Sequence, residues 1–442
     1  MKTYSSYKDS GIEWIDKIPE NWELVPIKYI GKVLNGSTPS TSNKEYWNGN
    51  ISWVTTDDLG KLKTKYIRKS RRRITKEGLN SCGTHLAPIG SVVISCRAPI
   101  GHLGILKVEA CTNQGCKTII PFNFNSLFLY YSILNSKEAI DSLGKGTTFK
   151  ELASSSLKDF KVLMPKIDEQ IQIANYLDQK TNQIDELIAK KEQLIKLLEE
   201  ERTAIINQAV TKGLNPDAAM KDSGIDWLGE IPEHWKEARI KNVANIIGRI
   251  GFRGYTTADL VEKGEGAISL SPSNVINQKL NIDSCTYLSW EKYEESPEIK
   301  IYSNDIILVK TGSTIGKTAI IPNETPEMTL NPQLVVMKEI KLFQKFLYFI
   351  MISDYFQGYF KVYTAGGSTP AISQEKINNF KIAFPPKEEQ IKIVKSIESN
   401  CFLIEETSNK ISQEIELLKE YKESLISNVV TGKIDVREEV LN

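Results

Sequence analysis

The chain contains one unit written twice. Residues 9–22 read DSGIEWIDKIPENW and residues 222–235 read DSGIDWLGEIPEHW, with nine of fourteen positions identical at a constant offset of 213. Residues 160–171 and 380–391 form a second match, with six of twelve positions identical at an offset of 220. A repeat constrains the architecture before any single element is assigned. Because the stretches between the two matches differ, we expect one frame that presents two unlike recognition surfaces.

Length and composition indicate a soluble protein of several domains. A chain of 442 residues is too long for one ordinary core, and 40% hydrophobic with 25% charged residues is typical of globular proteins. No apolar run approaches the roughly 18–20 residues of a membrane span. Residues 1–10 are polar and lack the apolar segment of a secretory signal. We therefore expect a cytoplasmic location and no membrane partner.

The cysteines do not indicate a metal site. Cys82, His85, Cys111 and Cys116 could form a zinc set, but their spacing matches no standard zinc finger. The six cysteines also contain no CxxC pair, which fits a reducing compartment. Small buried side chains are the better interpretation, and we expect no bound metal.

Each copy has three parts: a short tryptophan-bearing head, a β-rich stretch with glycine and proline between short strands, and a long helix. This order predicts an α+β protein. The expected strands are Ile51–Thr55, Ser91–Cys96, Cys116–Pro121, Ala267–Leu270, Asp305–Lys310 and Gln333–Lys338. The expected domains are 1–165 (head and first β-rich domain), 166–212 (first long helix), 213–385 (linker, head and second β-rich domain) and 386–442 (second long helix and tail).

A seven-residue apolar repeat predicts that the two long helices form a coiled coil. Pro165 and Pro385 precede the helices, and the first is expected over about 168–211. Gly213 and Gly432 follow them as C-terminal caps. The expected coiled-coil positions are Leu177, Ile184, Leu198 and Ile205 in the first helix and Ile397, Ile404, Ile411, Leu418 and Leu425 in the second.

The helices could each pair with other proteins, but pairing with each other buries both seams within one chain. We expect an antiparallel pair, with the β-rich domains at opposite ends and related by a pseudo-twofold axis. Lys191 occupies a heptad position where the second helix has Ile411. Because a buried lysine is costly, its end is expected to reach solvent or an acidic partner.

Catalytic motifs are incomplete, and no catalytic residue is predicted. Residues 311–318 (TGSTIGKT) resemble a phosphate-binding loop, but Gly312 and Gly316 have three residues between them instead of four, and a strand-like segment follows. Residues 331–334 (NPQL) faintly resemble the Asn-Pro-Pro-aromatic motif of adenine methyltransferases, without the second proline or the aromatic residue. A stand-alone nucleotide-using enzyme is the alternative that these two segments leave open.

Polar and basic loops indicate contact with DNA. Residues 61–76 contain nine basic and no acidic residues, which favours a surface that faces phosphates. Arg, Lys, Asn, Gln, Ser and Thr recognise base edges and phosphates, although ordinary turns are an equal alternative for any single loop. The first-copy candidates are Ser37, Thr38, Thr56, Lys69, Arg71, Arg72, Arg73, Arg97, His102, Asn113, Gln114, Lys145, Thr147 and Thr148. The second-copy candidates are Arg249, Arg253, Tyr255, Ser273, Asn274, Lys310, Ser313, Thr314, Lys317, Gln333, Ser368 and Thr369.

The repeated tryptophans Trp14, Trp22, Trp227 and Trp235 could stack on bases. They belong to the repeated frame and not to the divergent inserts. We therefore predict that they are packing anchors for the heads.

Taken together, these motifs resemble the specificity subunit of type I restriction-modification systems, over essentially the whole chain. The resemblance implies two target recognition domains joined by two helical regions in an antiparallel coiled coil. The motifs that carry it are the two heads, residues 45–53 (EYWNGNISW), 95–101 (SCRAPIG), 113–117 (NQGCK) and 310–317 (KTGSTIGK), and the PxxxEQxxI starts at 165 and 385.

The same resemblance implies function and partners. Such a subunit has no activity of its own and directs two adenine methyltransferase subunits, and in a full complex two ATP-dependent translocating nuclease subunits, to a split asymmetric site on double-stranded DNA. No cofactor is expected on this chain, whereas the partners are expected to use S-adenosylmethionine, ATP and Mg²⁺. About one helical turn between half-site centres would keep both on one face of the duplex. A coiled-coil scaffold without DNA contact is the remaining alternative.

Overall fold

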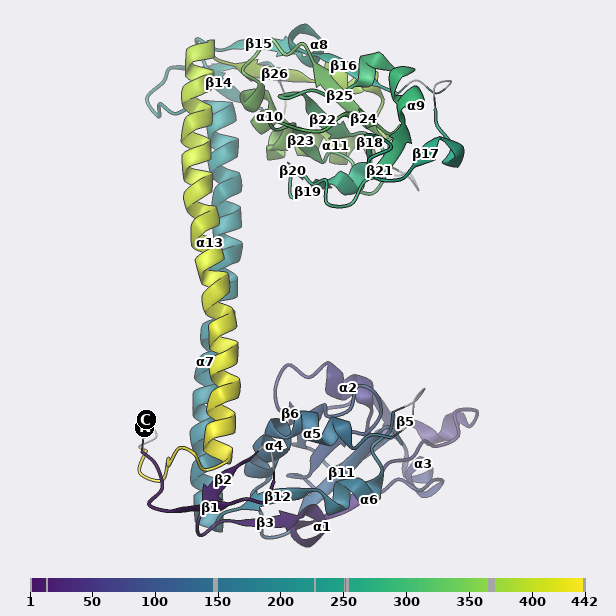
Figure 1. Ribbon diagram of the computed structural model, residues 1–442, viewed down its shortest axis with the longest axis vertical. Coiled ribbons are helices and arrows are strands. Elements are labelled where there is room, and N and C mark those ends of the chain that lie inside the picture. Colours follow the sequence, from purple (N-terminus) through teal and green to yellow (C-terminus); the bar gives the residue numbers. More distant parts are fainter. Residues whose placement is uncertain are drawn as a thin grey trace. The chain divides into compact units, whose positions relative to one another are not determined.

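The chain folds into two compact units that contain the same kinds of elements, shown in Figure 1. The first unit contains residues 1–191 and 413–442, and the second contains residues 192–412. Each unit has one head, one β-rich domain and a part of both long helices. The structure is a computed structural model that describes residues 2–12, 15–145, 150–225, 228–249, 251, 254–364 and 370–439.

The two heads are short hairpins that each lead to a buried tryptophan. In the first unit β1 (Tyr7–Asp9) pairs with β2 (Lys17–Pro19), and in the second β13 (Met220–Asp222) pairs with β14 (Glu230–Pro232). Trp22 and Trp235, which follow the hairpins, are 0% and 1% exposed. The predicted anchor role is confirmed for these two residues, while Trp14 and Trp227 lie outside the described residues.

Each β-rich domain is an insertion held by one two-stranded ribbon. β3 (Glu23–Pro26) pairs with β12 (Lys161–Met164), and β15 (Lys236–Arg239) pairs with β26 (Lys381–Phe384). The chain enters and leaves each domain through this ribbon. We call residues 27–160 and 240–380 the first and second β-rich domains. β12 and β26 lie within the second repeated segment, and β3 and β15 directly follow the repeated heads. The sequence between the strands can therefore change without altering the attachment.

Each domain has two sheets whose strand orders correspond, apart from one additional edge strand in the larger sheet of the first domain and one in the smaller sheet of the second. The larger sheet of the first domain has the order β4 (Gly31–Asn35), β11 (Cys116–Pro121), β8 (Val92–Ser95), β9 (Leu103–Leu106), β6 (Tyr66–Ile67). Its counterpart in the second has the order β16 (Asn245–Gly248), β25 (Leu334–Lys338), β22 (Ile306–Val309), β23 (Thr318–Ile320). The smaller sheets have the orders β10 (Ala110–Thr112), β5 (Trp47–Val54), β7 (Arg72–Ile74) and β17 (Leu260–Val261), β21 (Thr286–Ser289), β18 (Gly266–Leu270), β24 (Met328–Leu330). The six strands expected from the sequence are all present, with ends shifted by a few residues.

Short helices cover the sheets, and a small hairpin, β19 (Val275–Ile276) with β20 (Lys279–Leu280), is added in the second domain. The first domain has α1 (Ile27–Ile30), α2 (Thr56–Gly60), α3 (Lys76–Asn80), α4 (Ser126–Asn135), α5 (Lys137–Ser142) and α6 (Ser154–Asp159). The second has α8 (Ile240–Val243), α9 (Trp290–Glu294), α10 (Gln344–Ile352), α11 (Asp354–Thr364) and α12 (Gln374–Asn379).

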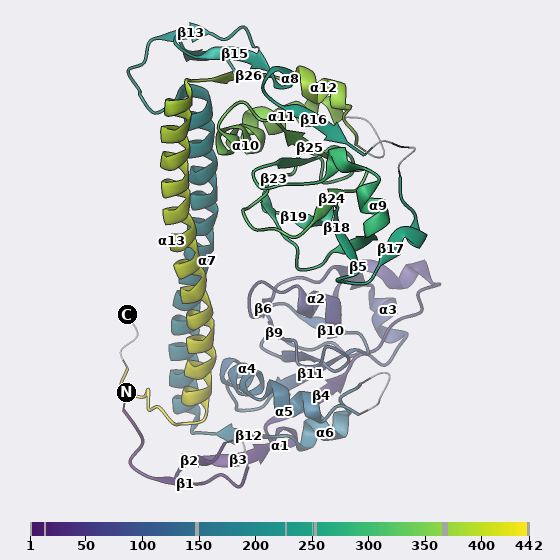
Figure 2. The same cartoon turned by 45° about the horizontal axis from the view of Figure 1, so that its top comes forward.

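The long helices are α7 (Ile167–Lys212) and α13 (Lys387–Val430), close to the predicted bounds. In the first unit the beginning of α7 packs on the end of α13, and in the second unit the end of α7 packs on the beginning of α13, so the pair is antiparallel (Figure 2). Gly213 and Gly432 both have a φ of 74° and end the helices as expected.

The predicted heptad positions lie in the seam, but the seam is wider than a strict coiled coil. Leu177, Ile184, Ile397, Ile411 and Leu425 are buried, whereas Leu198, Ile205, Ile404 and Leu418 are half-buried. Near the end of α7, Ile206 and not Ile205 is the buried residue, because this turn also faces the second head and its β-rich domain. The additional buried positions are Ala209, Val210, Ile415, Ile426 and Val429.

Lys191 finds the acidic partner that was expected. Its Nζ forms an ion pair with Glu414 of α13, and its side chain is 22% exposed. The stem of the lysine therefore covers the seam while its charge is neutralised at the edge, as amphipathic side chains commonly do.

A glutamine from the repeated helix start fastens each β-rich domain to its long helix. Gln170 Oε1 accepts a hydrogen bond from Asn125 N at 2.9 Å, just before α4. Gln390 Oε1 accepts one from Phe343 N at 2.8 Å, just before α10. Both glutamines are buried. The PxxxEQxxI motif is thus a structural fastener of the frame.

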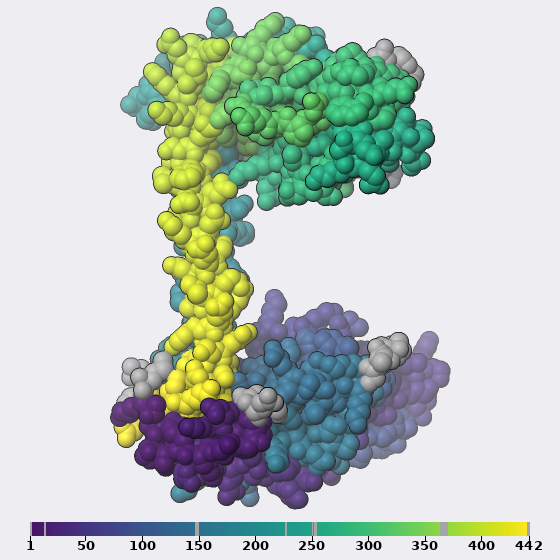
Figure 3. All heavy atoms as spheres, viewed as in Figure 1, coloured from purple at the N-terminus to yellow at the C-terminus, as the bar shows by residue number. Residues whose placement is uncertain are grey.

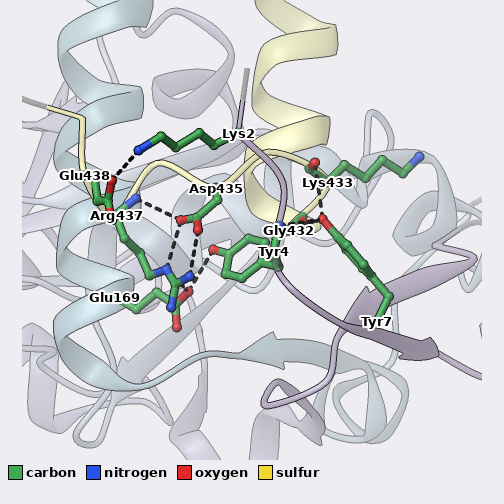
Figure 4. Close-up of polar contacts among 9 residues, drawn as sticks. All are labelled: Lys2, Tyr4, Tyr7, Glu169, Gly432, Lys433, Asp435, Arg437 and Glu438. Atoms are coloured by element: carbon green, nitrogen blue, oxygen red, sulfur yellow. Dashed lines mark hydrogen bonds and ion pairs between the residues drawn. The ribbon is translucent and has the colours of Figure 1, made fainter.

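The two ends of the described chain meet in the first unit, as Figure 4 shows. Asp435 N donates to Lys2 O at 2.9 Å. Tyr4 OH donates to Glu169 Oε1 at 2.7 Å, and Arg437 binds Asp435 through its Nε and Nη2 at 2.9 and 2.7 Å. We call residues 2–7 with 432–438 the terminal clasp. In Figure 3 the head (purple) covers the end of α13 (yellow) at this place.

In the second unit, the head is joined to the end of its long helix in a different way. There, residues 213–219 connect the end of α7 to β13 as continuous chain. Glu389, the counterpart of Glu169, accepts a hydrogen bond from Trp235 Nε1 at 3.2 Å and lies 2.7 Å from His234 Nε2. Trp22 Nε1 is buried and has no acceptor among the described residues. The two heads therefore share a shape but not a hydrogen-bond network.

Candidate nucleic-acid interface

Three loops of the first β-rich domain converge at one edge of its sheets. Ser37 N donates to Thr112 O at 2.9 Å, and Cys96 N donates to Gly115 O at 2.8 Å. Gly36 permits this approach, because a Cβ there would lie 1.9 Å from a backbone oxygen of the neighbouring loop. We call this edge the first rim; it comprises residues 36–40, 56, 97–99 and 112–115.

The rim brings several predicted contact residues together. Thr38 Oγ1 hydrogen bonds to Gln114 Oε1, and Gln114 is exposed. Arg97 is also exposed, but its Nε lies 3.2 Å from Glu151 Oε2. Lys145 joins the same edge through a pair of backbone hydrogen bonds with Glu151, at 3.0 and 2.9 Å. Thr147 and Thr148 lie outside the described residues.

The basic run 61–76 is not a single phosphate-facing patch. Lys65 points to α7, where its Nζ forms an ion pair with Asp178 and lies 3.1 Å from Tyr131 OH; its side chain is only 12% exposed. Arg71 and Lys61 both pair with Asp57, at 3.2 and 2.8 Å. The exposed basic residues without an ion pair in the described part of the chain are Lys63, Arg68, Lys69, Arg72, Arg73 and Lys76.

His102 lies away from the first rim. It lines a hollow of the first unit beside Gly60, Lys63 and Lys137, on the side that faces α7. Burial, with a smaller effect from the positive charge of Lys137, lowers the pKa of His102, so its ring is neutral at pH 7. Its predicted contact with DNA stays a prediction.

Two tryptophans, not predicted as site residues, connect the rim to the basic strand β7. Trp53 Nε1 donates to Ser37 O and Trp47 Nε1 donates to Ser40 O, both at 3.0 Å. The guanidinium carbon of Arg72 lies 3.7 Å from the centre of the Trp47 ring and 5.3 Å from that of Trp53. The sequence carries no simple signal for this contact, because six residues of regular strand would separate the tryptophans by about 20 Å. The irregularity in β5 between Trp47 and Ile51, both of which pair with Ile74, brings the two rings together.

The second β-rich domain forms a corresponding edge. Lys310 N donates to Gln333 O at 2.8 Å, and Gly312 N donates to Pro370 O at 2.8 Å. Ser313 and Gln333 are exposed, and Lys310, Thr314 and Lys317 are half-buried. We call this edge the second rim; it comprises residues 271–273, 310–317, 331–333 and 370–372. Ser368, Thr369 and Arg253 lie outside the described residues.

The segment that resembles a phosphate-binding loop is a turn closed by its own chain. Gly312 and Gly316 have φ values of 104° and 88°, and strand β23 follows them directly, where a nucleotide-binding loop would require a helix. Gly316 O accepts a hydrogen bond from Gln357 Nε2 at 2.8 Å. The segment 331–334 is likewise a turn, between β24 and β25.

Two predicted contact residues of the second domain are instead structural. Asn274 is 2% exposed, and its amide donates to Asn281 O and Ser284 O at 3.0 Å. Arg249 is 6% exposed, and its Nε donates to Leu330 O at 2.8 Å. Because both side chains are used inside the domain, we remove them from the candidate interface. Tyr255 is half-buried over Arg249, and Ser273 is exposed at the second rim.

Three of the six cysteines are buried, as the sequence favoured, and the other three are half-buried. Cys96, Cys111 and Cys116 are 0%, 1% and 0% exposed, and burial raises the pKa of Cys111 to about 12. Such thiols stay protonated at neutral pH and are poor metal ligands. Over the residues that the structure describes, no three His, Cys, Asp or Glu side chains gather as a metal site. Within the same residues, none of the helices is long and apolar enough to cross a membrane.

Comparison with known proteins places this two-domain frame in a defined class. The family model described as the type I restriction modification DNA specificity domain matches residues 19–197 and 232–417, one match for each copy of the repeat. The chain belongs to this family of type I DNA specificity domains.

One relative matches nearly the whole chain, and another matches less than half of it. The chain is 29% identical over 443 residues to the type I restriction enzyme MjaIX specificity subunit of Methanocaldococcus jannaschii, covering 96% of each. It is 30% identical over 204 residues to the EcoR124I/EcoR124II specificity subunit of Escherichia coli, covering 44% of this chain and 49% of that one.

Two solved structures have the same fold. A chain from a type I restriction-modification system matches with a TM-score of 0.72 and 14% identity, covering 94% of this chain and 99% of that chain. The HsdS subunit of Thermoanaerobacter tengcongensis matches with a TM-score of 0.58 and 13% identity, covering 94% and 98%.

Proposed function

We propose that the chain is the DNA-recognising specificity subunit of a type I restriction-modification complex, and that it acts in the cytoplasm. Each β-rich domain recognises one half of a split asymmetric site. The observation that carries this proposal is the pair of rims: corresponding loops converge at corresponding edges of two equal frames, yet their side chains differ. One frame with two unlike rims suits two unlike half-sites, and family membership supports the same function.

The polar composition of the rims suits DNA more than a small substrate. The first rim presents Thr38, Arg97 and Gln114, and the second presents Ser313 and Gln333, which are donors and acceptors that recognise base edges and phosphates. Exposed Lys69 and Arg73 next to the first rim supply sequence-independent attraction. The chain itself supplies recognition, and the chemistry belongs to its partners.

The long helices are the proposed docking surface for two methyltransferase subunits, and further for two nuclease-translocase subunits. Large apolar side chains are exposed on them: Leu187, Leu417 and Tyr421 in the first unit, and Leu194, Leu197, Phe402 and Leu403 in the second. Such exposure on a helix indicates a protein partner. We further propose that the partners use S-adenosylmethionine, ATP and Mg²⁺, and that helix length sets the spacer between the half-sites.

Single-molecule mapping of adenine methylation tests this function directly. A genome that carries the chain and its methyltransferase partner is compared with one that carries the partner alone. We expect a split motif that appears only with the chain. No new motif in the presence of an expressed and active methyltransferase would contradict DNA recognition and favour a scaffold role.

A charge experiment separates DNA contact from a scaffold role. Lys69→Glu with Arg73→Glu should weaken binding to all DNA and reduce the dependence of affinity on salt, since two phosphate contacts are lost. Lys61→Glu is the control, because Lys61 already pairs with Asp57. Unchanged DNA retention in the double variant would contradict phosphate contact at this place.

A further inference from the structure

Arg72 differs from Arg71 and Arg97, two other arginines near the first rim. Arg71 and Arg97 are paired with the carboxylates of Asp57 and Glu151. Arg72 is exposed, and within the described residues its guanidinium has neither a carboxylate partner nor a hydrogen-bond acceptor. It carries a full charge and a planar set of unused N–H donors next to a surface proposed to bind DNA.

The direction of this guanidinium is fixed by aromatic packing. Its carbon lies 3.7 Å from the centre of the Trp47 ring, which is van der Waals contact with the ring face. Trp47 and Trp53 form an edge-to-face pair with ring centres 5.1 Å apart. Because both indole N–H groups are hydrogen bonded to backbone oxygens, the platform itself is held in place.

Such preorganisation suits a directional contact through two donors more than the attraction of a point charge. A phosphate can be neutralised by a flexible lysine acting as a point charge, whereas a base edge requires two donors in one plane and in one direction. A stacked guanidinium has already lost much of its rotational freedom, so less is lost on binding. Two tryptophans that hold one exposed arginine on the edge strand β7 therefore indicate a directional contact.

We propose that Arg72 is a specificity-determining residue of the first β-rich domain, and that it recognises a guanine through paired N–H donors to O6 and N7 in the major groove. This inference rests on the proposed function, because it assigns one base of the half-site that the first domain recognises. Arginine bound to these two acceptors is the common geometry for guanine. Trp47 and Trp53 are positioning residues that act through Arg72.

The test maps methylation motifs with wild-type chain, Arg72→Ala, Arg72→Lys and Trp47→Leu. In Arg72→Ala we expect one G·C position of one half-site to accept other bases, with discrimination there reduced about 5- to 100-fold. Arg72→Lys keeps the charge but loses the planar donor pair, so it should relax the same position. Trp47→Leu should relax it partially. Arg73→Ala is the matched control and should lower methylation at all sites without changing the motif.

Each outcome decides the inference. A wild-type motif that depends on the chain, together with an unchanged motif in Arg72→Ala, would overturn the assignment of Arg72 and leave the proposed function standing. A uniform loss in Arg72→Ala that Arg72→Lys restores would identify a phosphate contact and also overturn it. Where Arg72→Ala abolishes methylation, Arg72→Lys decides: a relaxed position supports the inference, and an unchanged motif refutes it. Absence of any motif with the wild-type chain would instead refute the proposed function.

Discussion

Trp53 of the first β-rich domain and Ser269 of the second occupy the same register position on corresponding strands. Trp53 of β5 lies opposite Cys111 of the parallel neighbour β10 and opposite Arg72 of the antiparallel neighbour β7. Ser269 of β18 lies opposite Thr329 of the parallel neighbour β24 and opposite Thr286 of the antiparallel neighbour β21. In the first domain, the sheet at this position carries the exposed Arg72, which stacks on Trp47. In the second domain, Arg249 and Tyr255 cover the sheet at the corresponding position.

The two arginines show how one frame can give different surfaces. Arg249 Nη2 donates to Thr329 Oγ1 at 3.1 Å and its Nε donates to Leu330 O at 2.8 Å, so its donors are used within the domain. Tyr255 OH lies 3.3 Å from Ser269 Oγ and completes the cover. Arg72 remains exposed because the larger indoles fill the space below it. The frame therefore fixes where a side chain stands, and the inserted sequence decides whether that side chain is available to a ligand.

The strongest test of this comparison is an exchange of the insert. Replacing residues 27–160 by the corresponding insert of a relative, with both strands of the ribbon kept, should change one half of the methylation motif and leave the other half intact. The reason is that β3 and β12 belong to the frame and attach any insert in the same way. Motif mapping measures the result. A change in both halves would show that the two domains do not recognise DNA independently.

The next largest effect is expected at the two buried tryptophans. Trp22→Ala and Trp235→Ala should each lower the free energy of unfolding of their own unit by about 3–5 kcal/mol, because a large core side chain is removed. Hydrogen exchange resolved for residues of each unit measures this. Trp22→Phe and Trp235→Phe test the difference between the two heads. Trp235→Phe should lower the free energy of unfolding by about 1 kcal/mol more than Trp22→Phe, because Trp235 donates a hydrogen bond to the carboxylate of Glu389. Equal costs would contradict the difference between the heads.

The long helices offer a matched pair of substitutions at corresponding heptad positions. Ile411→Lys should destabilise the second unit by about 2 kcal/mol or more, because Ile411 is 7% exposed and the substitution places a charge at a buried apolar position. Lys191→Ile should cost less than about 1 kcal/mol, since the ion pair with Glu414 lies at the edge of the seam. Urea unfolding of both variants measures the two losses of free energy of unfolding. A larger loss in Lys191→Ile than in Ile411→Lys would refute the prediction.

The smallest effect concerns pH and the terminal clasp. A hydrogen bond from Arg437 lowers the pKa of Asp435, with partial burial opposing it. The resulting stabilisation, under about 1 kcal/mol, is present above the ordinary aspartate pKa of about 3.9 and is lost as the pH falls through the lower folded value. Hydrogen-exchange protection of residues 432–437 should therefore decrease below about pH 4. Asp435→Asn should remove this dependence, while the loop of the other unit at 213–219 should not show it.

The frame could be predicted from the sequence because it obeys local rules. Heptad spacing, prolines before the helices and glycines after them fixed both long helices within a few residues. Trp22 and Trp235 were correctly expected inside, because a repeated residue in a shared frame serves the frame. Lys191 was expected to meet an acidic residue from the cost of burying its charge alone.

The site was less predictable because it depends on contacts between distant segments. Lys65 belongs to a basic run by sequence, yet it points to Asp178 of α7. Arg249 and Asn274 have the residue types of DNA contacts but satisfy backbone oxygens of their own domain. The stacking of Arg72 on Trp47 joins residues 25 positions apart in the chain. Residue type indicates what a side chain can do, and only the fold decides whether solvent can reach it.

The two units are formed from different stretches of the chain, and this affects the order in which they can fold during translation. The second unit is one contiguous stretch, residues 192–412, whereas the first requires residues 413–442 as well. During translation from the amino terminus, the second unit has all of its residues available before the first does. Trp22 and Ile18 of the first head share one core with Leu425, Val429 and Val430, so this core stays incomplete until residues 425–430 have been made. The unit that is started first is completed last, and any premature stop after residue 412 leaves a finished second unit beside an open first one.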